Sequence, residues 1–175
     1  MSLSVSGKLT FLPEKLTPNL IRAVKRHVKR AAELNADMVR LSIDRGKDIV
    51  TGGSFQHLKP ITREVRAQRG IGGNHPLVES GNLYNSINVI TESDGYSVVM
   101  AEYGHYHNEG FTVGEHRWFK AGDDWYNFSG TDVPRRRFFE TPRAFFRRAE
   151  YKQLMNELEQ KVKNELKKAP VKRVG

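Results

Sequence analysis

The longest regular pattern in the chain is TPNLIRAVKRHVKRAAELNADMVRLSI, residues 17–43. Its apolar residues recur at steps of three and four, which is the spacing of one buried face of an α-helix. Thr17 and Pro18 supply a capping residue and a proline at the first helical position. Because no glycine or proline follows Pro18 until Gly46, the pattern predicts one long amphipathic helix that reaches Ile43 or beyond.

A second long helix is predicted near the other end of the chain. Thr141-Pro142 repeats the start signal, and apolar residues continue at helical spacing from Phe145 to about Lys168. Pro170 then stops the helix, because proline lacks the backbone N–H that a helix interior needs. Lysines gather in the last turns, where the helix dipole favours positive charge.

Between these helices the sequence predicts a β-hairpin. Residues 87–91 and 96–103 read as two strands, and Asp94-Gly95 between them is a strong turn signal because both residues tolerate positive φ. Ser80 is placed to cap a short helical turn just before the first strand. These elements indicate an α+β fold in which two long helices, N-terminal and C-terminal, pack on a small antiparallel sheet.

The remaining segments complete a single predicted domain over residues 1–175, with two long projecting loops. Residues 44–80 carry six glycines and two prolines without sustained periodicity and read as a loop, with one short basic helix over Thr62–Gln68. The other predicted segments are an N-terminal arm at 1–18, an extended β-excursion at 104–134 with strands around Glu115–Lys120 and Trp125–Phe128, and a flexible tail at 170–175.

Composition excludes several classes of protein. The chain has 175 residues and no cysteine, which rules out a disulfide scaffold, thiolate metal sites and cysteine nucleophiles. No stretch approaches the ~18 apolar residues of a membrane span, and the N-terminus lacks the pattern of a secretory signal, so we expect synthesis in the cytoplasm and no membrane contact. The net charge of +9 favours an anionic partner, either nucleic acid or an acidic protein surface.

Three histidines are the candidates for a metal site: His105, His107 and His116. On a strand, His105 and His107 would share one face and could bind zinc, as in a metal-dependent hydrolase. The alternative is that the segment closes the sheet and His107 forms a hydrogen bond at a turn. We favour this alternative because nothing in the sequence specifies the second shell that a metal-binding histidine needs. We therefore expect no metal, no cofactor and no catalytic residue.

Basic and aromatic residues form a second candidate site. Six arginines fall within fourteen residues, among four phenylalanines: Arg135, Arg136, Arg137, Arg143, Arg147 and Arg148, with Phe138, Phe139, Phe145 and Phe146. Such a mixture is typical of protein interfaces, and it also occurs in nucleic-acid-binding surfaces and on solvated faces with the phenylalanines turned inward. We favour the interface and assign Arg135–Phe139 to it, together with Trp118 and Trp125.

The order of these signals resembles a known family. The segment Phe55-x-x-Leu58-Lys59-Pro60-x-Thr62 precedes His75-Pro76-Leu77-Val78-Glu79-Ser80-Gly81-Asn82-Leu83-x-x-Ser86-Ile87, which is similar to the Pro-Leu-x-x-Ser/Thr-Gly-x-Leu-x-x-Ser-Ile core of tailed-phage virion-morphogenesis proteins. After the hairpin, Tyr103-x-x-Tyr106-His107-x-x-Gly110 resembles its Tyr-Ala-x-x-His-x-x-Gly segment. Val133-Pro134-Arg135-Arg136-Arg137-Phe138-Phe139 resembles its Ile/Val-Pro-Ala-Arg-Pro-Phe segment. With the flanking helices, the similarity spans residues 15 to 165.

The resemblance implies a non-enzymatic structural protein of the tail-completion or neck type. Such proteins form a ring, usually sixfold, that caps the tail and helps to join it to the filled capsid. The implied partners are further copies of the chain, the tail tube or tail terminator, the head–tail connector and DNA in the lumen. The implied location is the virion, and the host cytoplasm during assembly.

The resemblance also implies structural roles for particular residues. Gly81 and Leu83 would form the turn that fixes the loop onto the sheet, while His107 and Gly110 would end the hairpin. Arg135–Arg137 would anchor the 111–132 segment against a neighbouring copy, with Phe138 and Phe139 buried beside it. A basic nucleic-acid-binding module and a histidine-dependent metal hydrolase remain the alternative functions.

Overall fold

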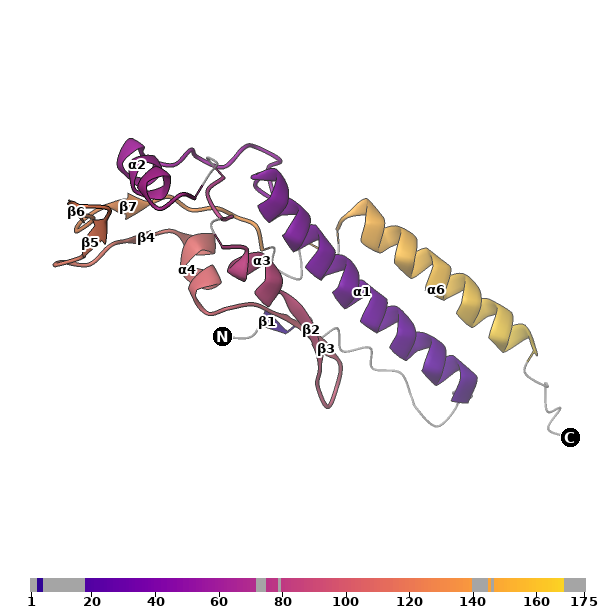
Figure 1. Ribbon diagram of the computed structural model, residues 1–175. Coiled ribbons are helices and arrows are strands. Elements are labelled where there is room, and N and C mark those ends of the chain that lie inside the picture. The colour runs from indigo at the N-terminus through magenta and orange to yellow at the C-terminus, as the bar shows by residue number, and fades with distance from the viewer. Residues whose placement is uncertain are drawn as a thin grey trace, which may run out of the picture. The chain divides into compact units, whose positions relative to one another are not determined.

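The computed structural model describes residues 3–4, 18–71, 75–78, 80–139, 145 and 147–168 (Figure 1). It combines helices with small antiparallel sheets, so the predicted fold class is confirmed. The elements in chain order are β1 (Leu3–Ser4), α1 (Pro18–Arg45), α2 (Pro60–Gln68), α3 (Asn82–Ser86), β2 (Asn88–Thr91), β3 (Tyr96–Val99), α4 (Tyr103–Glu109), β4 (Phe111–Thr112), β5 (Trp118–Ala121), β6 (Asp124–Asn127), β7 (Asp132–Val133) and α6 (Ala149–Lys168).

The contacts within the chain divide it into two compact units. Unit 1 is built mainly from residues 37–88 and 99–140. Unit 2 is built from residues 2–36, 89–98 and 141–175. Helix α1 therefore contributes its first part to unit 2 and its second part to unit 1.

Helix α1 forms as its apolar pattern predicts, from Pro18 to Arg45. The buried positions recur at three- and four-residue steps along its length, including Leu20, Ala23, Ala31, Ala32, Ala36, Val39 and Ile43. In unit 2, α6 runs alongside the first part of α1 (Figure 1), and Arg30 of α1 lies 3.9 Å from Glu157 of α6. The start of the second helix at Thr141-Pro142 lies outside the described residues.

The small sheet of unit 2 has the strand order β1-β3-β2. Leu3 pairs with Val98 and Ser4 with Ser97, so the N-terminal arm supplies an edge strand. The predicted hairpin is present, but its second strand ends at Val99 rather than at residue 103, because α4 begins there. Neither turn residue between β2 and β3 adopts positive φ, so the turn is not of the type expected from Asp-Gly.

Residues 44–80 contain more regular structure than the predicted loop. Helix α2 occupies residues 60–68, two residues longer than predicted at its start. Before it, Lys47 and Ser54 form an isolated bridge that closes a tight turn, in which the N–H of Asp48 donates to the carbonyl of Gly53 at 2.7 Å. The turn forms because Gly52 takes up φ +73°, which few other residues adopt.

The predicted β-excursion over residues 104–134 is wrong at its start, where the chain forms the helix α4 rather than an extended segment. Gly104 lets α4 pack closely, because a Cβ there would lie 2.8 Å from both Leu83 Cδ1 and the sulfur of Met100. The rest of the excursion, residues 111–133, forms a two-stranded arm, called here the β-arm or simply the arm. Phe111 pairs with Val133 at its base, and β5 and β6 form its tip close to the predicted positions.

The segment after this arm, residues 134–139, is called here the strap, because it is bonded to two other parts of unit 1, the turn after α1 and the helix α4. The N–H of Ile49 donates to the carbonyl of Arg137 at 2.6 Å, and the N–H of Arg136 donates to the carbonyl of His107 at 3.1 Å. The N–H of Phe139 donates to Asn108 Oδ1 at 2.9 Å. The strap also contributes Phe138, whose side chain is completely buried.

One ion pair reinforces the strap and predicts how unit 1 responds to acid. Asp48 accepts hydrogen bonds from Arg137 Nε at 2.9 Å and from the N–H groups of Val50 and Thr51 at 2.8 and 2.9 Å. Burial alone would raise the pKa of Asp48, but the two backbone donors and Arg137 outweigh it and hold that pKa below 3.8. Such a carboxylate stabilises the fold above its unfolded pKa, and this contribution is lost as the pH falls through the folded pKa.

We expect Asp48→Asn to lower the free energy of unfolding by about 1–2 kcal/mol at pH 7, because the charge pair is removed. The loss should shrink as the pH falls from 5 to 2, since the native carboxyl is then protonated too. Urea unfolding followed by circular dichroism measures both. Asp37→Asn is the matched control, because the side chain of Asp37 is 71% exposed in its pair with Arg40, so its loss should stay below about 0.5 kcal/mol. A loss for Asp48→Asn that is constant over this pH range would contradict the assignment.

Candidate functional site

The tip of the arm, the hairpin β5–β6, presents two tryptophans on one face. Trp118 pairs with Asn127 and Lys120 pairs with Trp125, and directly opposed residues share a face of the sheet. Because residues two apart on a strand also share a face, these four side chains form one surface, called here the Trp face. Its tryptophans are diagonal neighbours and are 57% and 63% exposed.

The opposite face of the hairpin packs on α2. Ala121 and Tyr126 form a small core with Val65 of α2, and Ile61 and Phe128 pack against it. This core gives the Trp face a firm support. The sequence predicts the short helix but not its role as a platform, although Ile61 and Val65 at a four-residue step are a signal for one buried face.

Hydrogen bonds also hold the β5–β6 hairpin on α2. The hydroxyl of Tyr126 accepts a hydrogen bond from Gln68 Nε2 at 2.6 Å and donates to Glu64 Oε1 at 3.3 Å. Burial raises the pKa of Tyr126, and the nearby carboxylates of Glu64 and Asp124 raise it further, so the hydroxyl keeps its proton at neutral pH. On the same side, the Arg69 guanidinium lies 5.1 Å from the centre of the Phe119 ring.

The segments that carry the family resemblance come together in unit 1. A pocket of about 530 Å³ is lined by residues of the segment 75–87, among them Leu77, Ser80 and Leu83. Tyr103 and His107 of the segment 103–110 line the same pocket. The segment 133–139 reaches the same pocket, because the backbone N–H of Arg136 donates a hydrogen bond to the carbonyl of His107. Stretches that are 20 to 60 residues apart in sequence therefore form one cluster.

The turn residues in this cluster have clear structural tasks. Gly81 adopts φ +74°, a backbone conformation that favours glycine, and Leu83 is 3% exposed. Ser86 Oγ donates to the carbonyl of Leu83 at 2.7 Å and accepts from the N–H of Ala101 at 2.9 Å. These two bonds tie α3 to the chain that leads into α4.

The prediction that His107 ends the hairpin is wrong, because His107 lies in α4. Burial lowers the pKa of His107, and the positive charge of Arg136 lowers it further. Burial likewise lowers the pKa of Arg136, with a contribution from Arg66, but an arginine remains charged at neutral pH. His107 is therefore neutral at pH 7 and lies beside a buried guanidinium.

The predicted interface residues of the strap are mostly inside the unit. Arg136, Phe138 and Phe139 are 4%, 0% and 5% exposed, so they form no surface for a partner. Arg137 is paired with Asp48, and Arg135 lies 3.1 Å from Glu109 with half of its side chain exposed. The arginines alternate in this way because an extended chain points successive side chains to opposite sides. Of the predicted set, Trp118, Trp125 and Arg135 remain on the surface, and the side chain of Arg137 is 37% exposed.

The three histidines of the candidate metal site are not brought together as a strand would bring them. His105 and His107 lie two apart on α4, where they point to different sides of the helix, and His116 follows in the arm with φ +58°. Within the described ranges, no three histidine, aspartate or glutamate side chains form a group that could hold a metal ion. No described helix combines the length and apolar character that crossing a membrane requires.

Comparisons with known proteins add no relative. No protein-family model, no curated protein and no solved structure matches this chain. Support for a function therefore comes from the residues and contacts of the chain itself and from the resemblance of its motif segments.

Gly110 allows the strap to approach α4 and yields a direct test. It adopts φ +80°, and a Cβ there would lie 2.9 Å from the backbone nitrogen of Arg135 and 3.1 Å from the carbonyl oxygen of Val133. We expect Gly110→Ala to lower the free energy of unfolding by at least about 2–3 kcal/mol. Gly130→Ala is the matched control, because Gly130 has φ +67° but nothing within 4 Å of the added Cβ, so about 1 kcal/mol is expected. Equal losses in urea unfolding would contradict the close approach.

Proposed function

We propose that this chain is a structural, non-enzymatic virion protein of a tailed bacteriophage, of the tail-completion or neck type. In this role several copies form a closed ring at the head-proximal end of the tail, sixfold as is usual in that family. The ring caps the tail and joins it to the filled capsid through contacts with the tail tube or tail terminator and with the head–tail connector. The protein is then part of the virion and is assembled in the host cytoplasm.

The Trp face is the observation that carries this proposal. Exposed tryptophans are rare on monomer surfaces and are the residues that most often dominate the binding energy of protein interfaces. Trp118 and Trp125 are side by side on a hairpin that packs on α2 and is tied to it by hydrogen bonds. Because the support is already ordered, little conformational entropy is lost when a partner covers the two rings.

A closed ring requires an interface between two different surfaces of neighbouring copies. The Trp face meets this requirement when it contacts a different part of the next copy rather than another Trp face. The segments that resemble the phage family support the same role from inside unit 1. Gly81, Leu83 and Phe138 serve packing and turn geometry, which is what a protein that acts by shape requires.

The alternative functions lose part of their basis. A metal hydrolase would use His105, His107 and His116, which the fold does not bring to one face. A nucleic-acid-binding module would use the basic face of the first half of α1 together with the arginines of the strap. The strap part of this surface is reduced, because Arg136 is buried and Arg137 is ion-paired.

The direct test of the proposal is electron microscopy of tails that are assembled without this protein. We expect tails of irregular length that fail to join filled capsids, and complementation with the intact chain should restore both. Tails of normal length that join capsids normally would overturn the proposal.

Within this role, replacing Trp118 and Trp125 together by alanine should abolish incorporation into tails. Each such residue is worth at least about 2 kcal/mol in a typical hot spot, so the loss of affinity should be 30-fold or more for each ring. The matched control replaces Val50 and Tyr84 by alanine, since both are exposed apolar residues of unit 1 outside the Trp face. Quantitative mass spectrometry of purified tails measures incorporation. Equal incorporation of both variants would show that the Trp face is not the contact.

A further inference from the structure

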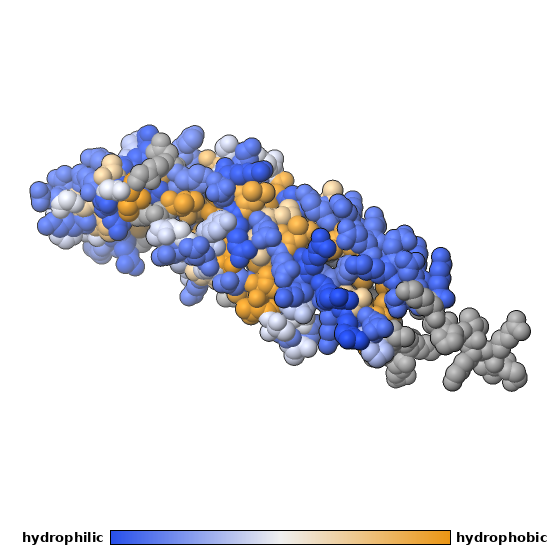
Figure 2. Space-filling model, turned by 45° about the vertical axis from the view of Figure 1, so that its right-hand side comes forward, coloured by the Kyte–Doolittle hydropathy of each residue, from blue (hydrophilic) through white to orange (hydrophobic). Residues whose placement is uncertain are grey.

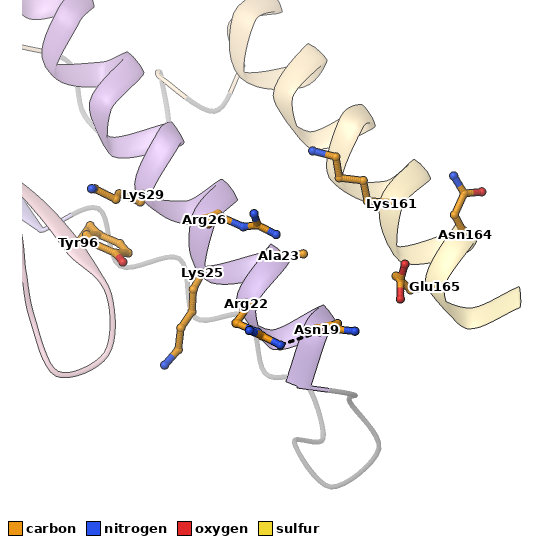
Figure 3. Close-up of a pocket in the computed structure, with 10 residues that line it drawn as sticks. All are labelled: Asn19, Arg22, Ala23, Lys25, Arg26, Lys29, Tyr96, Lys161, Asn164 and Glu165. Atoms are coloured by element: carbon orange, nitrogen blue, oxygen red, sulfur yellow. Dashed lines mark hydrogen bonds between the residues drawn. The ribbon is translucent and has the colours of Figure 1, made fainter. Parts of the chain in front are cut away.

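Five lysine and arginine side chains of unit 2 line a groove of about 800 Å³ (Figure 3). Four of its cations come from α1 and one from α6: Arg22, Lys25, Arg26, Lys29 and Lys161. Among the described residues that line it, Glu165 is the only carboxylate. In Figure 2, strongly hydrophilic side chains gather over the part of the visible face where α1 and α6 lie.

Figure 3 shows how these side chains are arranged. Arg26 and Lys161 point toward one another across the space between the two helices, and Lys29 extends toward Tyr96 of the hairpin. Lys29 has a loose, solvent-exposed ion pair with Glu33 at 3.6 Å. Within the described part of the chain, no ion pair involves Lys25, Arg26 or Lys161. Like charges that face one another in this way are stabilised by an anion between them.

We propose that this groove binds a single-stranded polynucleotide, with the cations contacting its phosphates and Tyr96 stacking on a base. Arg22, Arg26 and Lys29 follow one another at four- and three-residue steps, so they lie about 6 Å and then about 4.5 Å further along α1. This rise is comparable with the distance between neighbouring phosphates of an extended strand. A positive groove with an aromatic side chain in its wall is the general arrangement by which proteins hold unpaired nucleic acid.

Two features favour a polynucleotide over an acidic protein surface. Tyr96 offers a ring on which a nucleobase can stack, whereas a carboxylate side chain cannot stack on it. Asn19 and Asn164 add amide groups to the lining, which can bond to phosphates or to base edges. The inference does not rest on the virion role, because this groove belongs to unit 2 and the Trp face to unit 1.

Fluorescence anisotropy of the full chain with a labelled twelve-residue oligothymidylate tests the proposal. If three or four phosphates are contacted, raising the salt from 50 to 200 mM should weaken binding about 20- to 50-fold. The variant Arg22→Gln/Arg26→Gln should bind at least tenfold more weakly and with a smaller salt dependence. The matched control Arg147→Gln/Lys152→Gln removes the same charge from exposed positions outside the groove and should change affinity less than twofold. Equal weakening by both pairs would show attraction to net charge alone and overturn the site.

The tyrosine separates stacking from charge. Tyr96→Phe keeps the ring and should bind as the intact chain does, whereas Tyr96→Leu should weaken binding of the oligonucleotide about fivefold or more. Melting curves check that each variant is folded. The same assay with a twelve-residue polyglutamate peptide and with a twelve-base-pair duplex examines the competing ligands. Tighter binding of the peptide would identify an acidic protein surface, and tighter binding of the duplex would exclude the single-stranded ligand; either result would overturn the proposal.

Discussion

The backbone hydrogen bonds of the strap are the constraint on which unit 1 depends. Through residues 136, 137 and 139 the strap bonds to α4 and to the turn after α1, segments that lie up to about ninety residues away in sequence. None of these segments is a long element, and each would be only marginally ordered alone. Phe138 and Arg136 of the strap are 0% and 4% exposed, so burial of these side chains accompanies the hydrogen bonds. Gly110 makes the approach possible, because it has no Cβ to meet the strap backbone.

This constraint explains how a chain with short strands can present an ordered surface. The arm that begins at Phe111 is closed at its base by β4 and β7, directly before the strap, and is supported at its tip by α2. Both ends of the arm are therefore held, and the tryptophans of β5 and β6 are exposed on a supported hairpin. Unit 2 presents a different kind of surface, in which lysines and arginines of α1 and α6 surround a groove. We propose a protein partner for the first surface and an anionic ligand for the second.

The arginine run shows why sequence reasoning on the candidate site succeeded only in part. Six arginines among phenylalanines indicated an interface, and composition does not distinguish a surface cation from a buried one. The fold buries Arg136, pairs Arg137 with Asp48 and leaves Arg135 half exposed. These outcomes depend on which side of an extended segment faces the core and on a partner ninety residues away. The prediction that His105 and His107 share one face was wrong for a related reason. The sequence of residues 103–109 is compatible with the end of a strand, but the close packing of Gly104 against Leu83 favours a helix.

The sequence by itself determined the elements whose signal is local and long. The apolar period of residues 18–45 specifies α1, the Val- and Ile-rich stretches specify the hairpin β2–β3, and Gly81 marks a turn that requires positive φ. The tertiary structure alone decided that the motif segments meet around His107, that α2 supports the Trp face, and that five cations and Tyr96 line one groove. The physical reason is that periodicity and turn chemistry act over a few residues, whereas these contacts join segments whose proximity depends on how the whole chain packs.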